Sequence, residues 1–71
     1  MPQITFLNHP AFQKINLSLF SSDGKLVELI ADCYLKSGRQ QFLFGENVDP
    51  GIYYICLQMP GFKKLEKLMI L

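Results

Sequence analysis

The sequence predicts an all-β fold, a small antiparallel β-sandwich of about six or seven strands. Turn signals divide the 71 residues into short pieces about every 10 to 13 residues, which is typical of small all-β domains. Residues 15–19 alternate strictly between apolar and polar side chains, the pattern of a half-buried strand. Residues 52–57 are rich in β-branched and aromatic side chains, which are enriched in strands. Together these observations favour strands over helices for most of the chain.

Four strands can be placed from the pattern alone. They cover residues 4–6, 15–19, 40–44 and 52–57. Because successive side chains of a strand point to opposite faces, one face of each strand is expected to be buried between two sheets. With the strands that the family resemblance described below adds, the expected core consists of Phe6, Ile15, Leu17, Leu19, Val27, Ile30, Phe42, Phe44, Tyr53, Ile55, Leu57, Leu68 and Ile70.

The turns between these strands have recognisable chemistry. Asp23-Gly24 suits a hairpin turn, because Gly adopts positive φ without strain. Gly38 marks a further turn after Lys36-Ser37. Pro50-Gly51 and Pro60-Gly61 both suit a type II turn, in which Pro presets φ at the second position and Gly supplies positive φ at the third.

Two segments fit a helix as well as they fit a strand. The apolar residues of 25–35 and of 62–71 recur at helical spacing, and the second segment has Lys and Glu side chains on its other side. The alternative fold is therefore α+β, with two short helices at 25–35 and 62–71. Periodicity leaves both folds open.

Composition limits what the chain can bind. It is 49% hydrophobic and 13% aromatic, which indicates one packed domain over residues 1–71. A net charge of +1 without clustered Lys and Arg argues against nucleic acid as a partner. The longest apolar stretch is far shorter than the roughly 20 residues that cross a bilayer as a helix, so no bilayer-spanning segment is expected.

Catalytic machinery is not evident. His9 is the only histidine, and a base or a metal site needs further groups beside it. Cys33 and Cys56 can form one disulfide or remain as two partly buried thiols, and the pattern favours free thiols. Residues 46–49 carry oxygen ligands without the spacing of a calcium loop. We therefore expect no enzyme, no metal and no cofactor.

Six short motifs follow one another along the chain. An Ile-x-Phe strand with a Pro-containing tip occurs at residues 4–10, and an alternating strand runs into Gly24-Lys25-Leu26-Val27. A Leu-x-x-Gly turn at residues 35–38 precedes an aromatic strand at 42–44. Gly51-Ile52-Tyr53 opens the next strand, and Lys67-Leu68-Met69-Ile70-Leu71 ends the sequence.

In this order the motifs resemble the C-terminal sorting domain of the type IX (Por) secretion system of Bacteroidetes, an Ig-like β-sandwich. The resemblance covers residues 3–71, and it implies that 26–33 and 64–70 are strands. The chain departs from the family at Ser21, where Asp or Asn is usual, and no basic residue follows Leu71. The usual Asn-Pro motif at the domain start is also missing, so we expect this chain to be part of a longer exported protein.

The resemblance implies a function in protein export. The domain would direct an attached N-terminal passenger across the outer membrane, through recognition by outer-membrane secretion machinery. The passenger would pass through the periplasm to the cell surface or the medium. The residues implied in recognition are Gly51, Tyr53, Lys67, Leu68, Met69, Ile70 and Leu71, and those implied in turns are Asp23, Gly24, Gly38, Pro50 and Gly61.

A second class of function stays open. A structural or adhesive Ig-like module, similar to that of flagellar hook-capping proteins or to a glycan-binding accessory domain, shares the Gly-Lys-Leu-Val and Gly-x-Tyr motifs. In such a module the last residues would serve only as a strand. The identity of the passenger, its cleavage after export and the oligomeric state are not specified by the sequence.

Overall fold

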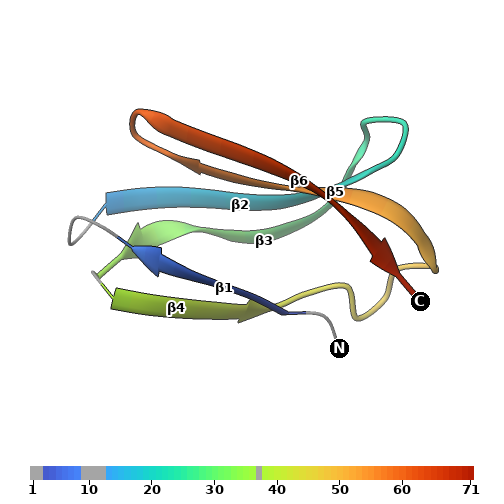
Figure 1. Ribbon diagram of the computed structural model, residues 1–71, viewed down its shortest axis with the longest axis horizontal. Helices are drawn as coiled ribbons and strands as arrows, with labels where there is room; N and C mark the ends of the chain where they lie inside the picture. Colours follow the sequence, from blue (N-terminus) through green and yellow to red (C-terminus); the bar gives the residue numbers. More distant parts are fainter. Residues whose placement is uncertain (1–2, 9–12, 37) are drawn as a thin grey trace.

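A computed structural model describes residues 3–8, 13–36 and 38–71, with the side chains of 6–8 excepted, and this part of the chain contains six strands and no helix (Figure 1). The strands are β1 (Gln3–Asn8), β2 (Gln13–Ser21), β3 (Leu26–Leu35), β4 (Gly38–Leu43), β5 (Gly51–Met59) and β6 (Phe62–Ile70). The predicted all-β fold is confirmed. The alternative with helices at 25–35 and 62–71 is wrong, because β3 and β6 occupy these segments.

The helix-like spacing in β3 has a structural cause. Its pairing with β2 shifts register twice, so that Ile30 and Val27 have no opposite residue in β2. An extra residue in one strand interrupts the two-residue alternation of side chains. Ile30 packs against the core, whereas Val27 is 39% exposed. The expected core position of Val27 is therefore wrong, since the second register shift carries it out of the buried face.

The strand character of β6 comes from its neighbour. β5 and β6 form a hairpin in which Met59 pairs with Phe62 and Gly51 with Ile70. The two residues between the strands are Pro60 and Gly61, and Gly61 has a φ of 73°. That value is what the third position of a type II turn requires, so the predicted turn is confirmed at this hairpin. Hydrogen bonding to β5 along nearly the full length of β6 outweighs the helical spacing of its apolar residues.

Six strands form two antiparallel sheets. One has four strands in the order β3-β2-β5-β6, and the other consists of β1 and β4. β2 and β5 are far apart in the sequence and lie side by side at the centre of the larger sheet (Figure 1). This arrangement makes β3 and β6 the two edge strands of the larger sheet.

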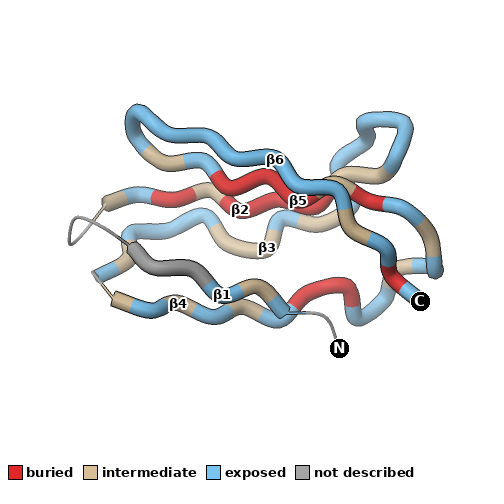
Figure 2. Tube along the Cα trace, viewed as in Figure 1, coloured by how far each residue is buried: buried red, intermediate tan, exposed pale blue. Residues whose placement is uncertain are grey.

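The core lies between the two sheets. The fully buried side chains are Ile15, Leu17 and Leu19 of β2, and Figure 2 shows burial concentrated in β2, β5 and the segment after β4. Phe44, Tyr53, Ile55, Leu57 and Ile70 complete the buried cluster, as predicted, while Ile30, Phe42 and Leu68 are half-buried against it. The expected core position of Phe6 lies outside the described side chains.

Pro50-Gly51 does not form the predicted type II turn. Gly51 lacks a positive φ and is already the first residue of β5. A β-carbon at Gly51 would lie 3.7 Å from Cε2 of Tyr53, which is an ordinary van der Waals contact. Gly61 therefore has a backbone conformation that favours glycine, whereas Gly51 does not.

This difference yields a first prediction. Gly61→Ala should lower the free energy of unfolding by about 1 kcal/mol or more, because an L side chain is strained at a positive φ. Gly51→Ala is the matched control and should change stability by less than about 0.5 kcal/mol. Urea unfolding followed by circular dichroism measures both values. Equal losses from the two substitutions would contradict the assignment of the turn.

Candidate functional site

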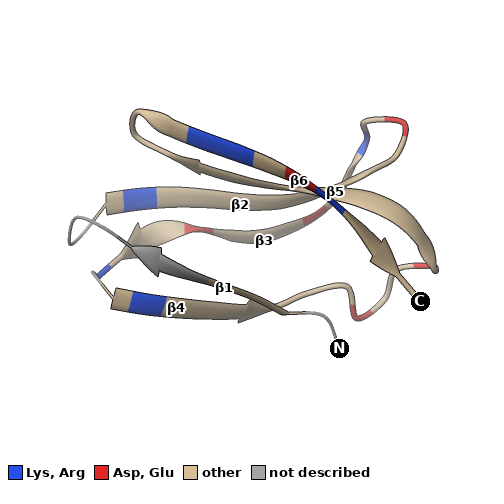
Figure 3. Ribbon diagram, viewed as in Figure 1, with Lys and Arg blue, Asp and Glu red and all other residues tan. Residues whose placement is uncertain are grey.

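β6 is the most accessible strand of the larger sheet. One of its edges pairs with β5, and its other edge pairs with no strand in the described part of the chain. Every residue of β6 from Phe62 to Lys67 is exposed. Lys63, Lys64 and Lys67 make this edge basic (Figure 3). Lysine on an edge strand is one of the features that hinder edge-to-edge pairing between proteins.

The predicted terminal motif is divided between two faces. Leu68 is half-buried and Ile70 is buried, and both pack with the core. Because side chains alternate along a strand, Lys67 and Met69 point to the outer face, which is the side of the four-stranded sheet turned away from β1 and β4. Both of these residues are exposed, and so is Leu71 beyond the end of the strand. Among the side chains of this motif, those of Lys67, Met69 and Leu71 are therefore the most accessible to another protein.

Gly51 and Tyr53 lie in β5, opposite two residues of the terminal motif in β6. Tyr53 lies opposite Leu68 and Gly51 opposite Ile70. The ring of Tyr53 is buried, and its hydroxyl donates a hydrogen bond to the carbonyl oxygen of Asp49 at 2.5 Å. This bond ties the start of β5 to the loop before it, as a tyrosine corner does in other β-sandwiches. The structure therefore brings the predicted Gly-x-Tyr motif and the terminal motif together along one hairpin.

The predicted turn residues lie at the ends of the strands. In the β2–β3 turn the amide of Gly24 donates to the carbonyl of Ser21 at 3.0 Å, and Gly24 has a φ of 92°. The Ser21 hydroxyl donates to the carboxylate of Asp23, and this bond lowers the pKa of Asp23 below its usual value of 3.8. Gly38, with a φ of 113°, opens β4, while Pro50 is an exposed residue before β5.

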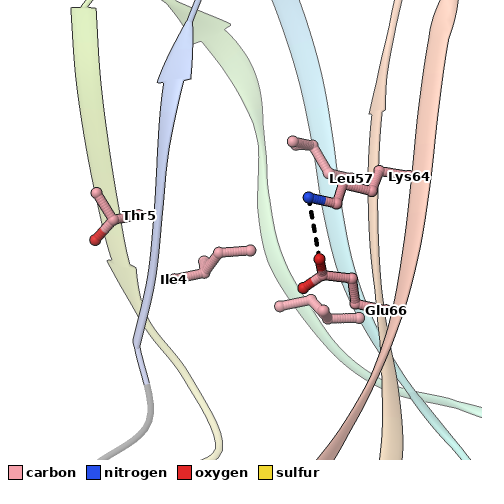
Figure 4. A pocket seen from close by; sticks show the side chains of 6 residues that line it. Ile4, Thr5, Leu57, Lys64 and Glu66 are labelled. Carbon is pink, nitrogen blue, oxygen red and sulfur yellow. Dashed lines mark ion pairs between the residues drawn. The ribbon is translucent and has the colours of Figure 1, made fainter.

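A small cavity lies beneath β6, between it and β1. It has a volume of about 100 Å³ and is lined by Ile4, Thr5, Ile55, Leu57, Lys64 and Glu66. The smaller sheet has only two strands, and the inner side of β6 stays accessible at Lys64 and Glu66. Lys64 and Glu66 form an ion pair of 3.0 Å at its rim (Figure 4). Both side chains are more than half exposed, so this pair adds little stability. The cavity is lined mainly by apolar side chains, and the charged groups of Lys64 and Glu66 lie at its rim.

The two thiols are separate. Cys33 is exposed on β3 and Cys56 is buried on β5, and both are free. β2 lies between these strands. Across residues 3–8, 13–36 and 38–71 no cluster of three or more His, Cys, Asp or Glu side chains could hold a metal ion. His9 and Pro10 lie outside the described residues.

Sequence reasoning missed two features of this region. Ser18 and Cys56 are buried although they face outward, where alternation predicts polar, exposed side chains. The hydrogen bond between Tyr53 and Asp49 was also not anticipated, because a backbone acceptor leaves no signature in the side-chain pattern.

Comparison with known proteins identifies no relative. No protein-family model matches the chain, and neither a curated protein nor a solved structure matches it. No helix long and apolar enough to cross a membrane occurs in the part of the chain that the structure describes.

The Tyr53 hydroxyl leads to a second prediction. Tyr53→Phe keeps the ring in the core and removes the bond to Asp49, and it should cost about 1 kcal/mol of unfolding free energy. Tyr54→Phe, at the half-buried neighbouring position, is the control and should cost less. Urea unfolding of both variants provides the comparison, and an equal or smaller loss for Tyr53→Phe would contradict the tie between β5 and its loop.

Asp23 leads to a third prediction, on pH. Since the folded pKa lies below the unfolded one, the stabilisation from this carboxylate is complete above about pH 3.8 and is lost as pH falls through the folded pKa. Ser21→Ala should raise the pKa of Asp23 toward 3.8, and Ser22→Ala should not. NMR titration of the Asp23 carboxyl carbon measures this, and an unshifted midpoint in Ser21→Ala would show that the Ser21 hydroxyl does not cause the low pKa.

Proposed function

We propose that this domain is a non-catalytic sorting module, which directs an attached passenger across the outer membrane through a type IX secretion system. One observation carries the proposal: the β5–β6 hairpin combines the Gly-x-Tyr and terminal motifs and presents an open, basic edge strand. The order of the six sequence motifs and the all-β fold support it. Protein binding, rather than chemistry on a small molecule, is the activity that such a strand provides.

Recognition proceeds by strand addition at β6. An extended segment of the receptor pairs with the free backbone groups of β6, and these main-chain hydrogen bonds supply affinity. Side chains that alternate along the edge supply selectivity. Lys67 offers its charge to an acidic group of the receptor, and Met69 and Leu71 offer apolar contact.

Buried members of the motifs have a supporting role. Leu68 and Ile70 anchor β6 to the core, Tyr53 anchors β5, and Gly51 pairs with Ile70 in the hairpin. Loss of residues 67–71 would remove Ile70 from the core as well as removing the contacts with a receptor. Point substitutions at exposed positions are therefore a sharper test than truncation.

The fourth prediction is an export assay. Residues 3–71 are fused behind a periplasmic reporter with its own signal peptide, in a bacterium with a working type IX system and in a mutant without it. Export should occur only in the working strain. Lys67→Glu should reduce it severalfold, because the reversed charge repels an acidic contact of the receptor.

Arg39→Glu is the matched control, since Arg39 is an exposed basic residue on β4 of the other sheet. This variant should be exported normally. Circular dichroism must show that both variants fold. A folded wild-type fusion that stays in the periplasm of both strains would refute the sorting function and favour a structural Ig-like module.

A further inference from the structure

The outer face of the four-stranded sheet carries more apolar surface than its position predicts. A sheet of a sandwich normally has polar side chains on the side turned to water. In this sheet Leu29 is 52% exposed and Leu65 60% exposed, and they lie on the two edge strands. Leu26, Ile52 and Met69 are also exposed on strands of this sheet. These five exposed apolar side chains lie on β3, β5 and β6 of one sheet, and exposed apolar surface gathered on one face is a feature of protein-binding sites.

Strand pairing arranges this face in rows that run across the four strands. One row runs from β3 to β6 through Leu29, Ser18, Cys56 and Leu65. The next row runs through Asp32, Asn16, Gln58 and Lys63. Each row therefore ends in a matched pair, leucine with leucine in the first and acid with base in the second.

We propose that this outer face binds a second copy of the chain, with a two-fold axis in the interface parallel to the strands. Such an axis keeps each row in place and reverses the order of the strands. Leu29 of one copy then faces Leu65 of the other, and Asp32 faces Lys63. Because the interface is isologous, each contact occurs twice. The strands of the two facing sheets stay aligned, as they do in other sheet packings.

The charge of Asp32 and the area of the outer face are both consistent with a second copy of the chain as the partner. Within one copy, Nζ of Lys14 lies 3.9 Å from Oδ1 of Asp32, and both side chains are about half exposed. Such an exposed pair is weak, so the negative charge of Asp32 is only weakly compensated. Four strands of nine or ten residues present a face of roughly 20 by 30 Å, about 600 Å² per copy, at the lower end of what stable interfaces bury. The dimer should therefore depend on concentration. The interface would also cover Lys67 and Met69, so a second copy and a secretion receptor would compete for this face.

The fifth prediction concerns the association of the 71-residue chain, measured by sedimentation equilibrium over a range of concentrations. The wild type should approach twice the mass of one chain as concentration rises. Leu65→Glu should weaken association by about a hundredfold, because it buries a charge against Leu29. Leu43→Glu is the control: Leu43 is 58% exposed on β4, away from this face, and its substitution should leave association unchanged.

A charge exchange tests the direction of the axis. Lys63→Asp should weaken association roughly tenfold, because it places two acids opposite each other, and Asp32→Lys should do the same with two bases. Lys63→Asp combined with Asp32→Lys should restore association. The double variant also shows that loss in the single variants is not a loss of folding. A wild type that remains a monomer at all concentrations, or a double variant that stays as weak as the singles, would overturn the proposal. Export of the fused reporter is measured separately from association, so a failure of the proposed dimer and a failure of the sorting function remain distinguishable.

Discussion

The pairing of β2 with β5 is the contact on which the rest of the structure depends. It joins two segments that are far apart in the sequence and aligns Leu17 with Leu57 and Leu19 with Ile55. These four side chains belong to the buried cluster, and removing their apolar surface from water stabilises the fold. β3 and β6 then extend the sheet on either side by local hairpins. A chain of this size has a small core, and the loss of this one pairing would divide the larger sheet into two separate hairpins, β2–β3 and β5–β6.

The unequal size of the two sheets determines where the surface is open. Four strands face two, and the inner side of β6 is left without cover near Lys64 and Glu66. Charged side chains can occupy inward positions there because water still reaches them. The same strand has an unpaired edge within the described part of the chain, and its outward residues are exposed. Both the proposed receptor contact and the proposed second copy use β6, since it combines an open edge with an accessible outer face.

The two proposed interactions use different parts of the domain. Strand addition engages the backbone of β6 and depends little on the rest of the sheet. Packing of a second copy engages side chains from all four strands, and it depends on the register that places Asp32 and Lys63 in one row. Ser18 and Cys56 are buried at the centre of that face, although they lie on its outer side. Exposure on the outer face therefore differs from strand to strand: Ser18 and Cys56 are buried, whereas Leu29 and Leu65 are exposed. The alternating sequence pattern does not predict this difference.

Much of the fold was determined by the sequence alone. Alternation in residues 15–19, the aromatic strand at 52–57 and the turns at Asp23-Gly24 and Pro60-Gly61 favoured a β-sandwich. The two strands contain six residues of its buried cluster, which are Ile15, Leu17, Leu19, Tyr53, Ile55 and Leu57. These features are local, because a side chain's face in a strand and a glycine's φ in a turn depend on near neighbours. The motif residues could be named from the sequence, but their division into buried Leu68 and Ile70 and exposed Lys67 and Met69 required the sheet. Tertiary structure alone decided that Val27 faces water, that Gly51 begins a strand, and that Leu29 and Leu65 share a row. Each of these depends on register between strands, which is set by hydrogen bonds to distant parts of the chain.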